Sequence, residues 1–207
     1  MIISFRVQFW RTRIIGYIFG AVAYLGLATH SDALDIGIEQ LDQYIVSTES
    51  RYDDITEGLE KHIRWFAGTQ KTPLAIVYLH GFSASAKEIS PVTEHLADQL
   101  GANAYYVRLR GHARSGAAMS EATVDAWKQD VLEAYEIAKL IGDEVVLVST
   151  STGGTLSTWL TSRNDPSLER VKMSLLVSPN FGLANKSGEI MRWGWGLQLA
   201  KWIKGDE

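Results

Sequence analysis

The stretch Glu144–Gly154 constrains the fold more than any other part of the chain. An aliphatic run, Val145–Val148, is followed at once by small hydroxyl residues and then by two glycines. Such a run is typical of a buried parallel strand, and the residues from Leu156 onward have helical spacing. The sequence therefore predicts a strand, a very tight turn and a helix, with Ser151 at the turn.

A serine at this turn presents its hydroxyl at the carboxyl end of a strand, directly in front of a helix N-terminus. The turn is strained, so the residues two positions on either side of the serine must be small, as Ser149 and Gly153 are. The backbone N–H of Thr152 lies at the helix start, where free donors and the helix dipole favour a negatively charged oxygen. Ser151 is thus a candidate nucleophile for acyl transfer, although turns rich in serine and glycine also follow many strands without catalytic residues.

Strands and helices alternate around this turn. Strands are predicted over 61–66, 74–79, 104–109, 144–150 and 171–177. One helix is predicted to start with Ser90 as N-cap and Pro91 as its first residue, to carry the apolar stripe Val92, Leu96 and Leu100, and to end at Gly101. A second is capped by Thr123 and has the buried face Val124, Trp127, Val131, Tyr135, Ala138 and Ile141. This order predicts parallel βαβ units in a three-layer α/β fold, with the site at the carboxyl ends of the strands.

Three short motifs follow successive strands in this order. They are His80-Gly81-Phe82, then Gly111-His112, then Ser151 with a glycine two residues later. Their order and spacing resemble the α/β-hydrolase family, above all its lysophospholipase, monoacylglycerol lipase and serine aminopeptidase group. Two positions depart from the family pattern: Ser149 replaces the first glycine of the elbow Gly-x-Ser-x-Gly, and Ala113 replaces the second glycine of Gly-His-Gly.

The resemblance implies a serine hydrolase that cleaves carboxylic esters, either lipid-like or with small acyl groups. Ser151 would be the nucleophile, and the backbone N–H groups of Phe82 and Thr152 would form the oxyanion hole. His80, Gly81 and Gly153 would support the site, and His112 would stabilise its loop. No metal and no organic cofactor is implied, and the expected partner is a small-molecule or lipid ester.

A serine nucleophile needs a general base and an orienting acid, which in this family follow the serine along the chain. All five histidines (His30, His62, His80, His95 and His112) precede Ser151, and no later carboxylate has the placement of a triad acid. We therefore expect the acid and the histidine beyond Glu207, which leaves the activity of the 207-residue chain alone in question. The alternative is a truncated, catalytically inactive relative that binds an apolar ligand or a partner through an open sheet edge and the tryptophan-rich tail.

The N-terminus has a pattern of its own. Three arginines, Arg6, Arg11 and Arg13, precede an uncharged apolar run at residues 14–28. This arrangement is typical of an apolar helix that precedes the fold as a secretory signal or a membrane anchor. It predicts an exported protein, which is periplasmic, extracellular or tethered to the membrane by its N-terminus. A buried core helix is the alternative. The expected organisation is a signal or anchor at 1–33, a helical lead-in at 34–60, the hydrolase core at 61–182 and the start of a cap or lid at 183–207.

Composition excludes several functional classes. The net charge of -4 and the lack of a dense basic face argue against a nucleic-acid partner. The absence of cysteine excludes disulfides, thiolate metal sites and a cysteine nucleophile. A hydrophobic content of 46% with 21% charged residues fits a globular domain with a sizeable core.

Overall fold

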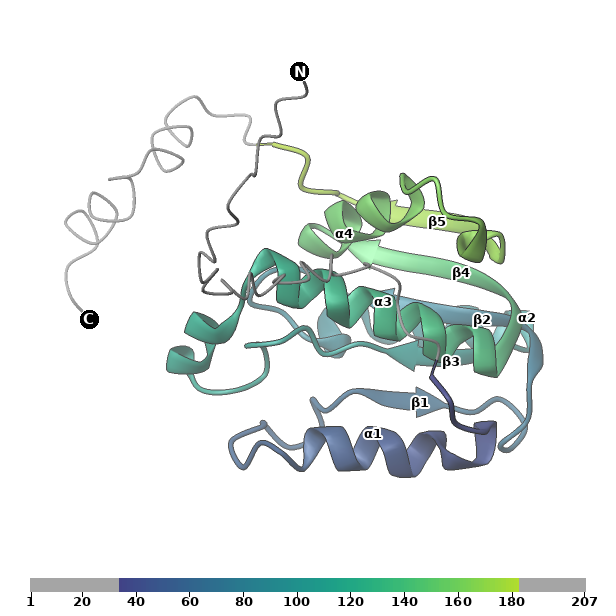
Figure 1. The fold of residues 1–207 in the computed structure, drawn as a ribbon, viewed down its shortest axis with the longest axis horizontal. Coiled ribbons are helices and arrows are strands. Elements are labelled where there is room, and N and C mark those ends of the chain that lie inside the picture. Colours follow the sequence, from purple (N-terminus) through teal and green to yellow (C-terminus); the bar gives the residue numbers. More distant parts are fainter. Residues whose placement is uncertain (1–33, 183–207) are drawn as a thin grey trace, which may run out of the picture. The chain divides into compact units, whose positions relative to one another are not determined.

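The computed structural model describes residues 34–182 of the chain (Figure 1). The predicted apolar helix and leader at 1–33 and the predicted lid at 183–207 lie outside the described residues. Within residues 34–182, no helix combines the length and apolar character that crossing a membrane requires.

The centre of the fold is a five-stranded sheet with the order β1-β3-β2-β4-β5. The strands are β1 (His62–Arg64), β2 (Thr72–Leu79), β3 (Asn103–Tyr106), β4 (Gly142–Thr150) and β5 (Val171–Val177). Strand β1 runs antiparallel to β3, and every other neighbouring pair is parallel. The predicted α/β sheet is confirmed, although β1 and β3 are shorter than the apolar patterns suggest.

The helices have the predicted order, with the first before strand β1 and the other three between later strands. They are α1 (Leu41–Glu49), α2 (Val92–Leu100), α3 (Val124–Ile141) and α4 (Thr152–Thr161), with short 3₁₀ helices at Ile38–Gln40, Ala86–Ile89, Gly116–Glu121 and Pro166–Leu168. The predicted cap of α3 is confirmed, because the Thr123 hydroxyl accepts a hydrogen bond from the Ala126 N–H at 3.0 Å. Gly101 ends α2 in the left-handed conformation, with φ of 61°.

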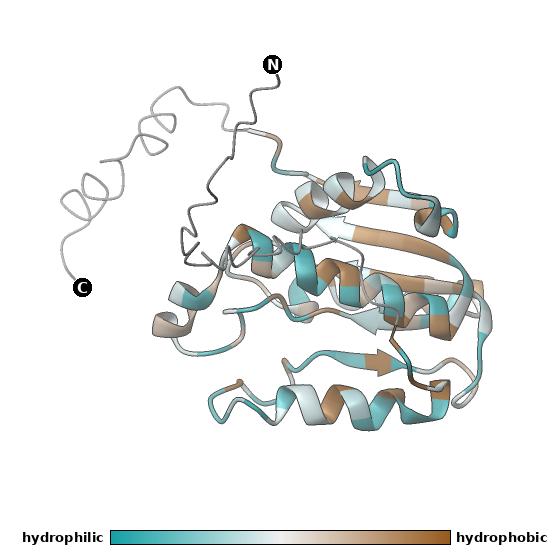
Figure 2. Cartoon of the chain, viewed as in Figure 1, coloured by the Kyte–Doolittle hydropathy of each residue, from teal (hydrophilic) through white to brown (hydrophobic). Residues whose placement is uncertain are grey.

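Two apolar cores lie on the two faces of the sheet, because successive strand residues point to opposite faces. Helices cover both cores, so the fold has three layers. Helices α1, α3 and α4 cover the face that carries Val77, Leu79 and Leu147. Helix α2 covers the other face, with Ile76 and Tyr78. Figure 2 shows the apolar colour concentrated on the central strands, while the helices alternate between polar and apolar residues.

Helix α2 differs from the prediction in its start and in its buried face. Pro91 itself is the N-cap, and the Ser90 hydroxyl donates instead to the Glu94 carboxylate at 2.7 Å. The buried residues of α2 are Thr93 and Ala97, and Leu96 is packed beside them. The outer members of the predicted stripe, Val92 and Leu100, are 62% and 45% exposed. The small side chains of Thr93 and Ala97 thus face the sheet, and each follows a larger residue of the predicted stripe by one position. Val124, in the first turn of α3, is likewise exposed rather than buried.

Strand β5 forms one edge of the described sheet, since β4 is its only neighbour among residues 34–182. Several of its aliphatic side chains are exposed, namely Met173, Leu175, Leu176 and Val177. An apolar strand edge of this kind is a surface for pairing with further chain or with a partner.

Candidate active site

Ser151 lies in the turn between β4 and α4 and has the strained backbone that the sequence predicts. Its φ of 47° and ψ of -112° are rare for a residue other than glycine. Hydrogen bonds hold it from both sides: its N–H donates to the Val177 carbonyl at 3.0 Å, and its own carbonyl accepts the Asn180 N–H at 3.0 Å. The turn thus fixes the side chain at the carboxyl end of β4, between the neighbouring strands β2 and β5.

Gly153 shows why the residues around this turn must be small. A Cβ atom on Gly153 would lie 2.1 Å from the carbonyl oxygen of Leu79 and 2.8 Å from that of His80. Ser149, on the other side of the turn, is fully buried, and its hydroxyl donates to the Leu175 carbonyl at 3.3 Å. The first turn of α4 therefore packs directly against the end of β2.

This packing brings the loop after β2 beside Ser151. A Cβ atom on Gly81 would lie 3.2 Å from the Cβ of Ser151. Within residues 34–182, no acceptor takes a hydrogen bond from the backbone N–H of Phe82 or from that of Thr152. Two unpaired donors thus occur at the two segments that meet at Ser151, one in the loop and one at the start of α4.

His80 joins the ends of β2 and β3 and holds this loop. The Leu109 N–H donates to His80 Nε2 at 3.1 Å, so the ring proton must reside on Nδ1, which donates to the Gly81 carbonyl at 2.8 Å. Burial lowers the pKa of His80 to about 4. Because the Gly81 carbonyl and the Phe82 N–H belong to one planar peptide group, this bond also fixes the direction of that N–H. Both ring nitrogens are occupied, which suits a supporting residue and leaves neither free to act as a base.

The depressed pKa of His80 is expected to make the protein less stable in acid. Below the unfolded-state value of 6.5 the unfolded chain binds a proton that the folded chain takes up only near pH 4. The titration of His80 alone should thus lower the free energy of unfolding by about 2 kcal/mol between pH 7 and pH 5, measured by urea denaturation. His80→Gln keeps a donor and an acceptor but cannot titrate, so this variant should lose most of that decrease. The exposed His62→Gln serves as control, and equal pH dependence of wild type and His80→Gln would contradict the assignment.

A small aromatic cluster borders the same loop. The buried ring of His112 lies 4.8 Å from that of His80, 5.9 Å from that of Phe82 and 5.5 Å from that of Trp127. Its Nδ1 lies 3.2 Å from the Leu109 carbonyl, and its buried Nε2 has no partner within the described part of the chain. Burial lowers the pKa of His112 as well. The His112 ring thus packs against both Phe82, in the loop after β2, and Trp127, in α3.

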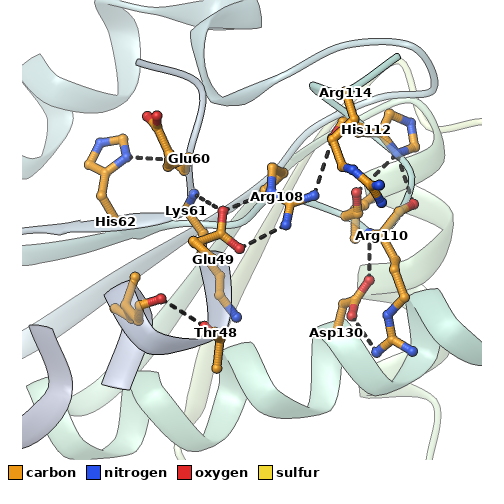
Figure 3. A network of polar contacts seen from close by, with 12 residues as sticks. Thr48, Glu49, Glu60, Lys61, His62, Arg108, Arg110, His112, Arg114 and Asp130 are labelled. Carbon is orange, nitrogen blue, oxygen red and sulfur yellow. Dashed lines mark hydrogen bonds and ion pairs between the residues drawn. The ribbon is translucent and has the colours of Figure 1, made fainter. Parts of the chain in front are cut away.

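An ion-pair network ties the N-terminal lead-in to this part of the molecule (Figure 3). Arg108 donates to both oxygens of Glu49, through Nε at 2.7 Å and Nη2 at 2.8 Å, and its Nη1 donates to the His112 carbonyl at 3.2 Å. The backbone N–H of Lys61 also donates to Glu49, at 3.0 Å. Helix α1 is thus fixed to the loop that carries His112. The spacing of residues along the chain does not reveal such a pair, because 59 positions separate its members.

A residue that the sequence patterns do not single out is Glu88, in the 3₁₀ helix Ala86–Ile89. Its carboxylate accepts a hydrogen bond from the Gly81 N–H at 2.8 Å. A glutamate in an irregular connection matches no motif, so only the folded chain reveals this contact. No group of three or more His, Cys, Asp or Glu residues within 34–182 has the arrangement of a metal site.

Residues 70–205, more than half of the chain, match the family described as serine aminopeptidase, S33. The chain belongs to this family of α/β hydrolases. The match includes all of the predicted site, from the loop after β2 to the turn that holds Ser151.

Solved structures share the fold of this S33-family chain. One, reported with the metagenome-derived lipolytic enzymes LipS and LipT, has a TM-score of 0.58 at 19% identity and covers 68% of this chain and 54% of its own. Another, BpoC from Mycobacterium tuberculosis, has a TM-score of 0.50 at 16% identity and covers 75% of this chain and 52% of its own. The chain thus spans about half the length of these structures. A search of curated protein sequences gives no significant match.

Proposed function

We propose that the protein is a serine hydrolase that cleaves carboxylic esters, either lipid-like or with small acyl groups. The observation that carries this proposal is the strained Ser151 turn, where two segments with unpaired N–H donors meet. Membership of the S33 family supports the same reaction class. No metal or organic cofactor enters the proposed reaction.

In the proposed reaction Ser151 Oγ attacks the ester carbonyl carbon, and the carbonyl π electrons move onto oxygen. The N–H groups of Phe82 and Thr152 stabilise this oxyanion. Its collapse breaks the ester C–O bond, the base returns the Ser151 proton to the leaving oxygen, and the alcohol departs from an acyl-enzyme. Water then attacks the acyl group and releases the acid and the serine.

The base that takes the Ser151 proton is proposed to lie outside the described residues. Within residues 34–182, no histidine is hydrogen-bonded to Ser151, and both nitrogens of His80 are already engaged. We propose further that the protein is exported and that the apolar run at residues 14–28 is its signal or its membrane attachment.

The test of this function is rapid mixing of p-nitrophenyl butyrate with the whole protein, including the segment that carries the proposed base. An acyl-enzyme mechanism predicts a burst of about one p-nitrophenol per protein molecule, followed by slower steady-state release. The activated leaving group makes acylation fast relative to deacylation. Release of p-nitrophenol no faster than in buffer alone would contradict the proposed function.

The exposed apolar edge of β5 favours a second candidate, a catalytically inactive relative that binds a partner or an apolar ligand. It predicts self-association or ligand binding that survives loss of the Ser151 hydroxyl. Sedimentation velocity of the wild type and of Ser151→Ala, beside the burst measurement, separates the two functions.

A further inference from the structure

The carboxylate of Glu88 connects the ends of β2 and β4 through a chain of hydrogen bonds. Its Oε2 accepts from the Gly81 N–H at 2.8 Å and from the Tyr78 hydroxyl at 2.9 Å. The buried Tyr78 hydroxyl lies 3.1 Å from Thr150 Oγ1, and since its only proton is donated to Glu88, the Thr150 hydroxyl is the donor of that bond. One side chain thus reaches both the loop after β2 and the residue directly before Ser151.

Gly81 is enclosed between Glu88 and Ser151. A Cβ atom on Gly81 would lie 2.9 Å from Glu88 Oε1 on one side and 3.2 Å from the Ser151 Cβ on the other. The carboxylate and the serine therefore flank the same backbone position. A shift of the loop at Gly81 would alter its contact with both.

The bonds to Gly81 determine where the next N–H points. Its carbonyl accepts from His80 Nδ1 at 2.8 Å and from the Ala84 N–H at 3.3 Å, and its N–H is held by Glu88. Glycine has the least restricted backbone of all residues, so these three bonds replace the restraint that a side chain would provide. The Phe82 N–H that follows is left unpaired by the described residues.

We propose that Glu88 is a positioning residue that holds the Gly81 N–H and thereby keeps the Phe82 N–H directed at the oxyanion formed by attack of Ser151. This inference rests on the proposed function. A carboxylate suits the role because a bond from N–H to an ionised acceptor is stronger than one to a neutral acceptor. Glu88 is exposed, so solvent screens its repulsion of the oxyanion.

The test compares kcat and KM for p-nitrophenyl butyrate in variants of the whole protein. Glu88→Ala should lower kcat by about 10- to 100-fold and leave KM within about twofold, because the loss is confined to stabilisation of the transition state. Glu88→Gln retains an acceptor oxygen and should recover kcat to within about fivefold of wild type. Lys87→Ala is the matched control, because the Lys87 side chain has no hydrogen bond among the described residues, and it should change kcat less than about twofold.

A second readout separates positioning from a general loss of structure. A boronic acid that forms a tetrahedral adduct with the serine should bind at least about tenfold more weakly to Glu88→Ala, in parallel with the fall in kcat. If Glu88→Ala does not fold, Glu88→Asp replaces it: the shorter side chain withdraws the acceptor and should lower kcat in the same way.

The proposal is overturned if kcat is unchanged in the folded variant, if KM rises in place of a fall in kcat, or if Glu88→Gln is as slow as Glu88→Ala. None of these results contradicts the assignment of Ser151 as the nucleophile. Full activity in Ser151→Ala would instead remove the proposed function itself.

Discussion

Replacement of Ser151 by alanine is expected to lower kcat for ester cleavage by about 10⁶-fold, the order of magnitude found when the nucleophile of a serine protease is removed. The variant loses the atom that attacks the carbonyl and retains the N–H donors of Phe82 and Thr152, so a small residual rate is expected. Alanine tolerates the φ of 47° about as well as serine does, and the Ser151 hydroxyl has no hydrogen bond within residues 34–182. The fold should therefore be unaffected.

The measurement is steady-state hydrolysis of p-nitrophenyl butyrate, with urea denaturation to confirm unchanged stability. Ser162→Ala is the matched control: its exposed hydroxyl caps the end of the same helix α4 by donating to the Trp159 carbonyl at 2.9 Å. That variant should retain at least half of the wild-type kcat. More than about a tenth of wild-type activity in Ser151→Ala would show that another residue is the nucleophile.

Replacement of Arg108 by methionine is expected to lower the free energy of unfolding by about 3–5 kcal/mol. Arg108 and Glu49 are each 7% exposed, and among residues 34–182 the variant leaves the buried Glu49 carboxylate with the Lys61 N–H alone as a partner. It also removes the stacking of the guanidinium on the Tyr52 ring, whose centroid is 5.0 Å away. Urea denaturation at neutral pH measures the loss.

Two further variants make this stability test specific. Lys172→Met breaks an ion pair of similar length, 2.9 Å to Glu144, but both partners are exposed, so the expected loss is below about 1 kcal/mol. The double change Arg108→Met with Glu49→Leu removes both buried charges and should recover much of the lost stability. A loss below about 1 kcal/mol for Arg108→Met alone would contradict the claim that the buried Glu49 carboxylate needs Arg108 as its partner.

The features that sequence predicted well are those determined by neighbouring residues. The turn at Ser151 follows from an aliphatic strand, small flanking residues and a helical pattern that come in direct succession. The cap at Thr123 and the end of α2 at Gly101 each depend on residues within a single helical turn, so the local sequence is enough to predict them. The buried face of α3 repeats often enough over 18 residues for its period to be clear, apart from the exposed Val124.

The features that sequence could not predict depend on contacts between distant residues or on a shift of one position. In the nine-residue helix α2, the stripe that starts at Val92 and the face that starts at Thr93 have the same spacing, and the sheet selects the smaller side chains. The bond from Gly81 to Glu88 forms within an irregular connection that has no period. The pair of Glu49 and Arg108 forms only when α1 packs beside the loop after β3.

The most direct test of the central claim is to identify the residue that becomes acylated. The whole protein is treated with a fluorophosphonate, digested, and analysed by mass spectrometry of its peptides. The account predicts a single phosphonylated residue, Ser151, with no labelling of Ser151→Ala and unchanged labelling of Ser162→Ala. Phosphonylation of a different serine, or equal labelling of wild type and Ser151→Ala, would contradict it.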